Sequence, residues 1–198
     1  ASYNENNSAY NETSTEYLDE TSKVNSGTIK LNGDSIKFNG SGALVENGNT
    51  VTILFPGTYL ISGKLNDGEI IVDIGAKGVV ELVLNNMEIY CSYTSPIYIK
   101  NAKETIITLE EGSQNIVTDG ANYILIDQAD GEPNAAIFSK DDLTVKGSGT
   151  LKVYGNYNNA ITSKDTLKIT GGNIIVEAVD DGLMGRDLVS IKGGNITI

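Results

Sequence analysis

The sequence predicts an all-β protein, a parallel β-helix with three strands and about 22–25 residues per coil. Residues 136–145, 160–169 and 182–191 repeat one pattern, at spacings of 24 and then 22 residues. Each copy joins short apolar runs by glycine turns and lacks helical periodicity, which is typical of a solenoid of stacked coils. The 22 glycines and only 3 prolines suit many tight turns between short strands.

We expect two parts in the chain. Residues 1–25 are rich in Asn, Ser, Thr and Glu, and they predict a disordered or loosely docked leader or linker. Residues 26–198 are expected to form the β-helix. Because the sequence ends on an apolar strand, we expect further coils or self-association at that open edge.

The expected strands follow in order. Residues 29–31 and 35–38 flank an Asn-Gly pair and predict a hairpin that caps the solenoid. Further short strands are predicted at 51–55, 59–61, 70–72, 79–84, 97–99 and 105–109. Residues 82–84 align with 107–109, so the repeat begins before its three clearest copies. Residues 118–134 interrupt the repeat and predict an insertion, either on the binding face or on a tolerant edge.

Composition excludes several classes of function. The net charge of −12 and pI of about 4.3 argue against a nucleic-acid partner. The absence of His removes the Ser-His-Asp triad and makes a zinc site improbable. Cys91 is expected to be a buried, inert thiol. No apolar run of about 18 residues is present, so no membrane span is expected.

Aligning the repeats places carboxylates above one another, with Asp141, Asp165 and Asp187 in one column. At a spacing of ~4.8 Å, two such charges repel by about 3–4 kcal/mol, which favours a cation between them. A second column precedes each strand, and it contains Asn134, Asn158, Asn159, Asp180 and Asp181. Oxygen ligands of this kind suit calcium, and the candidate ligands are Asp141, Asp142, Asn158, Asn159, Asp165, Asp180, Asp181 and Asp187. The alternative is that these are ordinary turn residues and side-chain ladders without metal.

A column of cations lies beside the carboxylates, formed by Lys140, Lys164 and Arg186. It predicts either a solvated salt-bridge ladder or a row of subsites for anionic or hydroxyl-rich sugars. Tyrosine rings suit the apolar faces of sugars, and the preferred candidates are Tyr123, Tyr154 and Tyr157.

Several motifs carry a resemblance in their order along the chain: residues 134–143, 155–161, Ser163-Lys164-Asp165, Asp180-Asp181-Gly182 and Gly185-Arg186-Asp187. Over residues 50–198 the chain resembles bacterial extracellular carbohydrate-binding-domain proteins, which are related to family 9 polysaccharide lyases. The resemblance implies a right-handed parallel β-helix, bound calcium, and affinity for cellulose and for pectin or polygalacturonate. It also implies a secreted or cell-surface location.

Three functions follow from this resemblance and from the columns. The leading one is a non-catalytic, calcium-containing polysaccharide-binding protein. The alternative is a calcium-dependent pectate or pectin lyase, in which Lys140 or Lys164 would be the base. The third is a structural surface β-helix without affinity for glycans.

Overall fold

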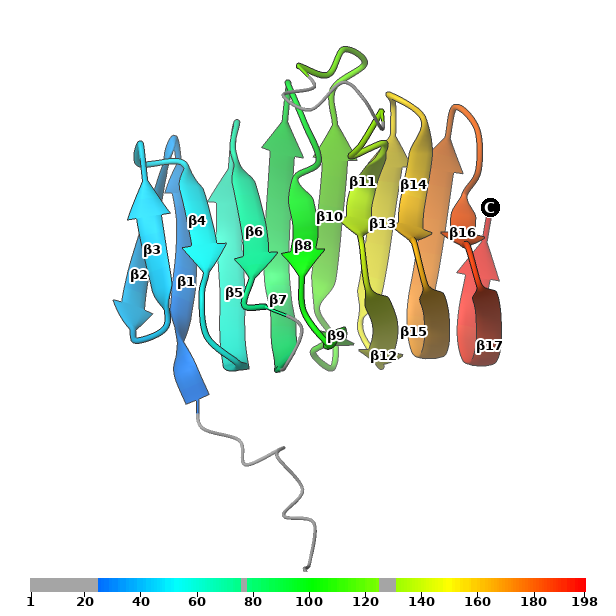
Figure 1. Cartoon of the computed structure of the whole chain (residues 1–198), viewed down its shortest axis with the longest axis horizontal. Helices are drawn as coiled ribbons and strands as arrows, with labels where there is room; N and C mark the ends of the chain where they lie inside the picture. The colour runs from blue at the N-terminus through cyan, green and yellow to red at the C-terminus, as the bar shows by residue number, and fades with distance from the viewer. Residues whose placement is uncertain (1–24, 76–77, 125–130) are drawn as a thin grey trace, which may run out of the picture.

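The computed structural model describes residues 25–75, 78–124 and 131–198, and within these ranges the chain forms seventeen strands and no helix. The strands form two sheets (Figure 1). The seven-stranded sheet has the spatial order β16 (Leu183–Gly185), β14 (Asn159–Ser163), β11 (Ala135–Ser139), β8 (Ile97–Asn101), β6 (Glu69–Asp73), β4 (Thr50–Ile53) and β3 (Ala43–Glu46). The ten-stranded sheet contains β1 (Asn25–Gly33), β2 (Ser35–Gly40), β5 (Gly57–Leu65), β7 (Val79–Cys91), β9 (Glu104–Leu109), β10 (Gln114–Asp119), β12 (Asp142–Gly147), β13 (Thr150–Gly155), β15 (Thr166–Ala178) and β17 (Leu188–Thr197). The expected leader lies outside the described residues, apart from Asn25 at the start of β1.

Parallel strands dominate both sheets. In the seven-stranded sheet, β4, β6, β8, β11, β14 and β16 pair in parallel in chain order. In the ten-stranded sheet, β7 pairs with β9 along its first half and with β10 along its second half. The chain therefore returns to the seven-stranded sheet once per coil, and the coils stack along the long axis of the molecule (Figure 1). This arrangement is the predicted β-helix-like, all-β fold.

The predicted repeats stack in register. Ile137 lies beside Ile161, and Ile161 lies beside Leu183, on neighbouring strands of the seven-stranded sheet. The earlier repeat is confirmed too, because Leu82 of β7 pairs with Ile107 of β9. Residues that are equivalent in sequence thus become neighbours in space, which is the basis of every column described below.

Antiparallel pairs close the N-terminal end of the stack. β1 and β2 form the predicted hairpin, with Asn32 opposite Ser35 and with Gly33 at a φ of +68°. β3 and β4 form a second antiparallel pair. Since β2 and β3 are the terminal strands of the two sheets, hairpins cover this end of the core.

The core consists of aliphatic columns that run from coil to coil. Val51, Ile70 and Ile97 occupy neighbouring strands in register, and all three are fully buried. Burial of each such side chain contributes about 1.5–3 kcal/mol relative to exposure. Alternating buried and half-buried positions along β4, β6 and β9 confirm the period of two that the sequence shows.

One corner of the core is polar. Asn115 is fully buried, and its Oδ1 accepts a hydrogen bond from the amide of Met87 at 3.0 Å. Its Nδ2 donates to Ser113 Oγ at 2.8 Å and to the carbonyl of Thr150 at 3.1 Å. This one side chain therefore joins β7, β10 and β13, and its polar atoms are satisfied as burial requires.

The predicted insertion leaves the stack between β10 and β11 and returns to it, although residues 125–130 lie outside the described ranges. Its described parts contact the seven-stranded sheet. The Tyr123 hydroxyl oxygen lies 3.1 Å from the carbonyl oxygen of Ala135, and Pro133 is buried. All five residues of β11 and of β14 are buried, so both faces of these strands are covered.

Cys91 is fully buried, as predicted, and burial raises the pKa of its thiol to about 11. The thiol is therefore protonated at neutral pH and is a poor nucleophile or metal ligand. The described ranges contain no helix that is long and apolar enough to cross a membrane.

The C-terminal end of the stack exposes apolar side chains. Leu188 and Ile191 of β17 are each 54% exposed, and Val189 is 40% exposed. Among the described residues, β17 pairs with β15 alone and β16 pairs with β14 alone. Self-association or further coils at this edge remain a prediction.

Candidate functional site

Four cations lie in a column at the carboxyl ends of four neighbouring strands of the seven-stranded sheet, β8, β11, β14 and β16. The structure places the predicted Lys140, Lys164 and Arg186 in this column and adds Lys100. Backbone hydrogen bonds connect these residues from coil to coil. The amide of Lys140 donates to the carbonyl of Ile99, next to Lys100, at 2.9 Å. The same bond recurs from Lys164 to Ser139 (2.9 Å) and from Arg186 to Ser163 (3.0 Å). We call Lys100, Lys140, Lys164 and Arg186 the basic ladder. Its steps are about 4.8 Å, the spacing of neighbouring strands.

Glu132 from the insertion bridges the middle of the basic ladder. Its Oε2 lies 3.8 Å from Lys140 Nζ, and its Oε1 contacts Lys164 Nζ. The Glu132 side chain is only 11% exposed, whereas those of Lys140 and Lys164 are 42% and 31% exposed. The two ladder ends differ from the middle, because Lys100 Nζ lies 5.7 Å from the ring centroid of Tyr98 and Arg186 is exposed.

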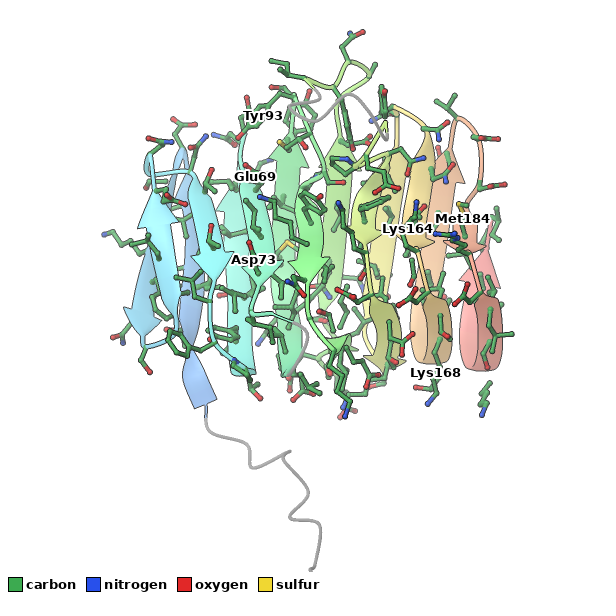
Figure 2. The ribbon with its side chains drawn as sticks, in the orientation of Figure 1. Glu69, Asp73, Tyr93, Lys164, Lys168 and Met184 are labelled. Carbon is green, nitrogen blue, oxygen red and sulfur yellow. The ribbon has the colours of Figure 1, made fainter. Side chains whose placement is uncertain are left out.

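A hollow of about 530 Å³ opens beside the first two steps of the ladder. Its walls combine carboxylates, lysines, tyrosines and apolar side chains, and the principal ones are Glu69, Asp73, Tyr93, Tyr98, Lys100, Ile124, Glu132, Pro133 and Lys140. Figure 2 shows Glu69 and Asp73 on β6, with Tyr93 beyond the start of that strand, on the Glu69 side, and Lys164 further along the same sheet. The hollow and the basic ladder therefore form one surface across β6, β8, β11, β14 and β16.

The hollow offers both donors and acceptors of hydrogen bonds. Burial raises the pKa of Tyr93 to about 12, so its hydroxyl keeps its proton at neutral pH. Burial also raises the pKa of Glu69, an effect that Lys100 partly offsets. Tyr98 contacts Phe138 edge-on, with ring centroids 5.8 Å apart, which fixes one aromatic wall. Aromatic walls with a few polar groups are typical of sites that bind sugars or other small polar molecules.

The three predicted tyrosines lie elsewhere. Tyr123 and Tyr157 stack on each other, with ring centroids 4.1 Å apart and planes 10° apart. Tyr154 lies on β13 in the ten-stranded sheet, between Thr118 and Glu177. The structure therefore does not bring the three together on the ladder, and Tyr93 and Tyr98 line the hollow instead.

The predicted carboxylate column is present on the turn after the basic ladder. The Asp187 amide donates to the carbonyl of Asp165 at 3.1 Å, so these residues are neighbours in successive coils. Partial burial, and then the charges of Asp187, Asp142 and Asp141, raise the pKa of the Asp165 carboxyl. Two of the four carboxylates also accept backbone hydrogen bonds: Asp141 from Ala102 at 2.8 Å and Asp142 from Thr166 at 3.0 Å.

The second predicted column, of Asn and Asp residues, lies at or just before the starts of β11, β14 and β16. The amide of Asp180 donates to the carbonyl of Asn158 at 3.0 Å. Asn159 Oδ1 accepts from the amide of Asp181 at 3.1 Å, so this oxygen serves the backbone. Asn134 Oδ1 is buried and has no hydrogen-bond partner among the described residues. In the same ranges, no three Asp, Glu, Cys or His side chains are arranged around one point as metal ligands.

Comparison with known proteins decides the family. Residues 47–198 match the family described as carbohydrate-binding domain-containing protein. This chain belongs to that family. One relative of the same description, from Acetivibrio thermocellus, is 48% identical over 128 residues. That match covers 65% of this chain but 45% of the relative, so the chain corresponds to less than half of the relative's length.

A solved structure supports the same assignment for the fold. It is described as the polysaccharide lyase-like protein from C. thermocellum, in a gadolinium derivative. The two structures superpose with a TM-score of 0.84 at 44% sequence identity, over 87% of this chain and 69% of the other. This carbohydrate-binding-domain protein is therefore lyase-like in structure, as the sequence motifs indicated.

Proposed function

We propose that this carbohydrate-binding-domain protein binds plant cell-wall polysaccharides without cleaving them, with acidic chains such as polygalacturonate along the basic ladder. The observation that carries the proposal is the continuity of the ladder with an aromatic hollow on one face. Four cations one strand apart suit a polymer that repeats its carboxylates, because each ladder step can meet another part of the chain.

The net charge makes this local arrangement necessary. The protein carries −12, so its overall field repels an acidic polymer. Exposed charges farther apart than about 8–10 Å are largely screened at physiological salt. A polymer held against the ladder therefore interacts mainly with the ladder cations and with the carboxylates that pair with them.

Cellulose is a second proposed ligand, and its binding must rest on other contacts. It carries no charge, so the ladder cations supply only hydrogen bonds. The Tyr98 ring and the hydroxyl of Tyr93 in the hollow offer stacking and hydrogen bonding to a pyranose. Both polymers lie outside cells, so we propose a secreted or cell-surface location for the protein.

Calcium is proposed as a structural ion of the two oxygen-rich columns. Two features of the described residues fit it: the partial burial and the neighbouring carboxylates that together raise the pKa of Asp165, and the buried, unpartnered Oδ1 of Asn134. The related structure from C. thermocellum is a gadolinium derivative, and gadolinium, like calcium, is a hard cation. Asp165, Asp187, Asn158 and Asp180 would supply carboxylate and amide oxygens, which calcium prefers.

We also infer that the coil is right-handed with three strands per turn. The strands β8, β9 and β10 form one such turn, and β11, β12 and β13 form the next. Crossovers between parallel strands are right-handed in about 98% of cases.

The test is affinity electrophoresis through gels that contain polygalacturonate, with Lys164→Ala compared against Lys168→Ala. Lys168 lies on β15 in the ten-stranded sheet, well separated from Lys164 in Figure 2. Removal of one ladder cation is expected to weaken binding about two- to fivefold, the effect of one partly exposed charge contact. Equal retardation of the two variants would reject the ladder as the binding site.

A further inference from the structure

The insertion places a carboxylate where the proposed ligand would place one. Glu132 Oε2 lies 3.8 Å from Lys140 Nζ, and Oε1 contacts Lys164 Nζ, so one carboxylate spans two steps of the basic ladder. A uronate side group is also a carboxylate, and it would meet the same two ammonium groups. Glu132 and an acidic polysaccharide therefore compete for one position.

We propose that Glu132 is a built-in competing anion, which acidic chains displace when they bind and which sets the preference between acidic and neutral glycans. This inference rests on the proposed function, because it concerns the same ladder. The competing carboxylate comes from the insertion, whereas the cations come from the stacked coils. Its position can thus change without breaking the stack.

The location of Glu132 supports this role. It lines the hollow together with Pro133, and it also pairs with Lys164 one coil beyond the hollow. A polymer that runs from the hollow along the ladder must cross this point. The Glu132 side chain is only 11% exposed and its carboxylate faces the two lysines, whose side chains are 42% and 31% exposed.

The exchange also has a favourable balance of charges. When a uronate replaces Glu132, Lys140 and Lys164 keep a carboxylate partner, and the displaced Glu132 becomes hydrated. A neutral glycan carries no carboxylate, so its displacement of Glu132 would remove the carboxylate that Lys164 contacts and supply none in its place. Neutral glycans are therefore expected to bind in the hollow with Glu132 still in place.

The experiment compares wild-type protein, Glu132→Gln and Glu111→Gln. Glu111 lies in the exposed turn between β9 and β10, so its substitution makes the same change of charge away from the ladder. Binding of a galacturonate oligomer, its methyl ester and a cello-oligosaccharide is measured by calorimetry, and a melting curve confirms that each variant is folded.

We expect Glu132→Gln to tighten binding of the galacturonate oligomer about two- to fivefold, the range of one charge contact. Binding of the methyl ester and of the cello-oligosaccharide should stay unchanged, and Glu111→Gln should match the wild type. A residue that merely held the insertion in place would not discriminate between the acid and its ester.

The failure of this inference differs from the failure of the proposed function. Equal or weaker binding of the galacturonate oligomer by Glu132→Gln, with the wild type binding well, overturns the competing anion and leaves the function intact. No binding of any oligomer by wild type or variant overturns both. If Glu132→Gln binds the galacturonate oligomer and the wild type does not, the result supports the competing anion and shows that Glu132 blocks the site.

Discussion

Tyr123 and Tyr157 stack face to face with ring centroids 4.1 Å apart, although 34 positions separate them in the chain. The Tyr123 hydroxyl also donates to Asp119 Oδ2 at 2.7 Å. Asp119 Oδ1 accepts from the amide of Asn156, next to Tyr157. These contacts tie the start of the insertion, which later supplies Glu132, to the turn between β13 and β14.

Replacing Tyr157 by Leu should destabilise this junction. The variant loses the aromatic stack, which is worth about 0.5–1.5 kcal/mol beyond the buried area. Urea unfolding should show this loss in the free energy of unfolding. Tyr154→Leu is the control, since no ring contact involves Tyr154 among the described residues. An equal loss in both variants would mean that the stack adds nothing specific.

Asp119→Asn should change how stability depends on pH. Burial raises the pKa of this carboxyl above its ordinary value of 3.8, despite hydrogen bonds from Tyr123 and Asn156. The native state thus holds the proton more tightly than the unfolded state, so this group loses stabilising effect as pH rises from 3.8 to the native pKa. Above that pKa its contribution is constant.

Asp119→Asn has no titrating group at this position. Between pH 3.8 and the native pKa of Asp119, the free energy of unfolding of the wild type should therefore fall relative to that of the variant. The free energy of unfolding is measured for both proteins at a series of pH values. At neutral pH the variant should compare better with the wild type than it does below pH 3.8, because it carries no buried charge to desolvate. A difference between the two proteins that is independent of pH would contradict this assignment.

The sequence predicted the stacking of coils because the repeat itself defines the register. Ile137, Ile161 and Leu183 align by spacing alone, and so do Lys140, Lys164 and Arg186. Lys100 escaped this alignment for a physical reason. Lys100 and Lys140 are 40 positions apart because the insertion lies between them, so a period of 24 or 22 residues does not align them.

The partners of the ladder could not be predicted in the same way. Glu132 reaches the cations because the insertion folds back on the seven-stranded sheet, and no local periodicity specifies that path. The stack of Tyr123 on Tyr157 has the same origin. Repeats therefore predict contacts between coils, while contacts of the insertion depend on tertiary packing alone.

Calcium should stabilise the fold if the carboxylate column binds it. A ligand that binds only the native state adds about 2.7 kcal/mol at a hundredfold excess over Kd. Chelation should therefore lower the Tm, and elemental analysis should find calcium in the untreated protein. An unchanged melting curve together with the absence of metal would reject this proposal.

Asp165→Asn tests the calcium proposal further, because the substitution should affect the Tm differently with chelator and with calcium. In the presence of chelator, the variant should melt at or above the wild-type Tm, because the repulsion from Asp187, Asp142 and Asp141 is reduced. In excess calcium, it should gain less than the wild type, because one oxygen ligand is weakened. Asp73→Asn, on the distant β6, should respond to calcium as the wild type does.

Lys100→Ala and Arg186→Ala should separate the two kinds of glycan. Both residues end the basic ladder, so both substitutions should weaken binding of polygalacturonate about two- to fivefold, and more at low salt than at high salt. Only Lys100 also lines the hollow and lies over the Tyr98 ring. Lys100→Ala should therefore weaken cellulose binding as well, whereas Arg186→Ala should leave it unchanged.

Pull-down on insoluble cellulose and affinity electrophoresis in polygalacturonate measure the two effects on the same samples. Parallel losses on both polymers for Arg186→Ala would indicate one shared site along the whole ladder, and the separate role of the hollow would then be wrong.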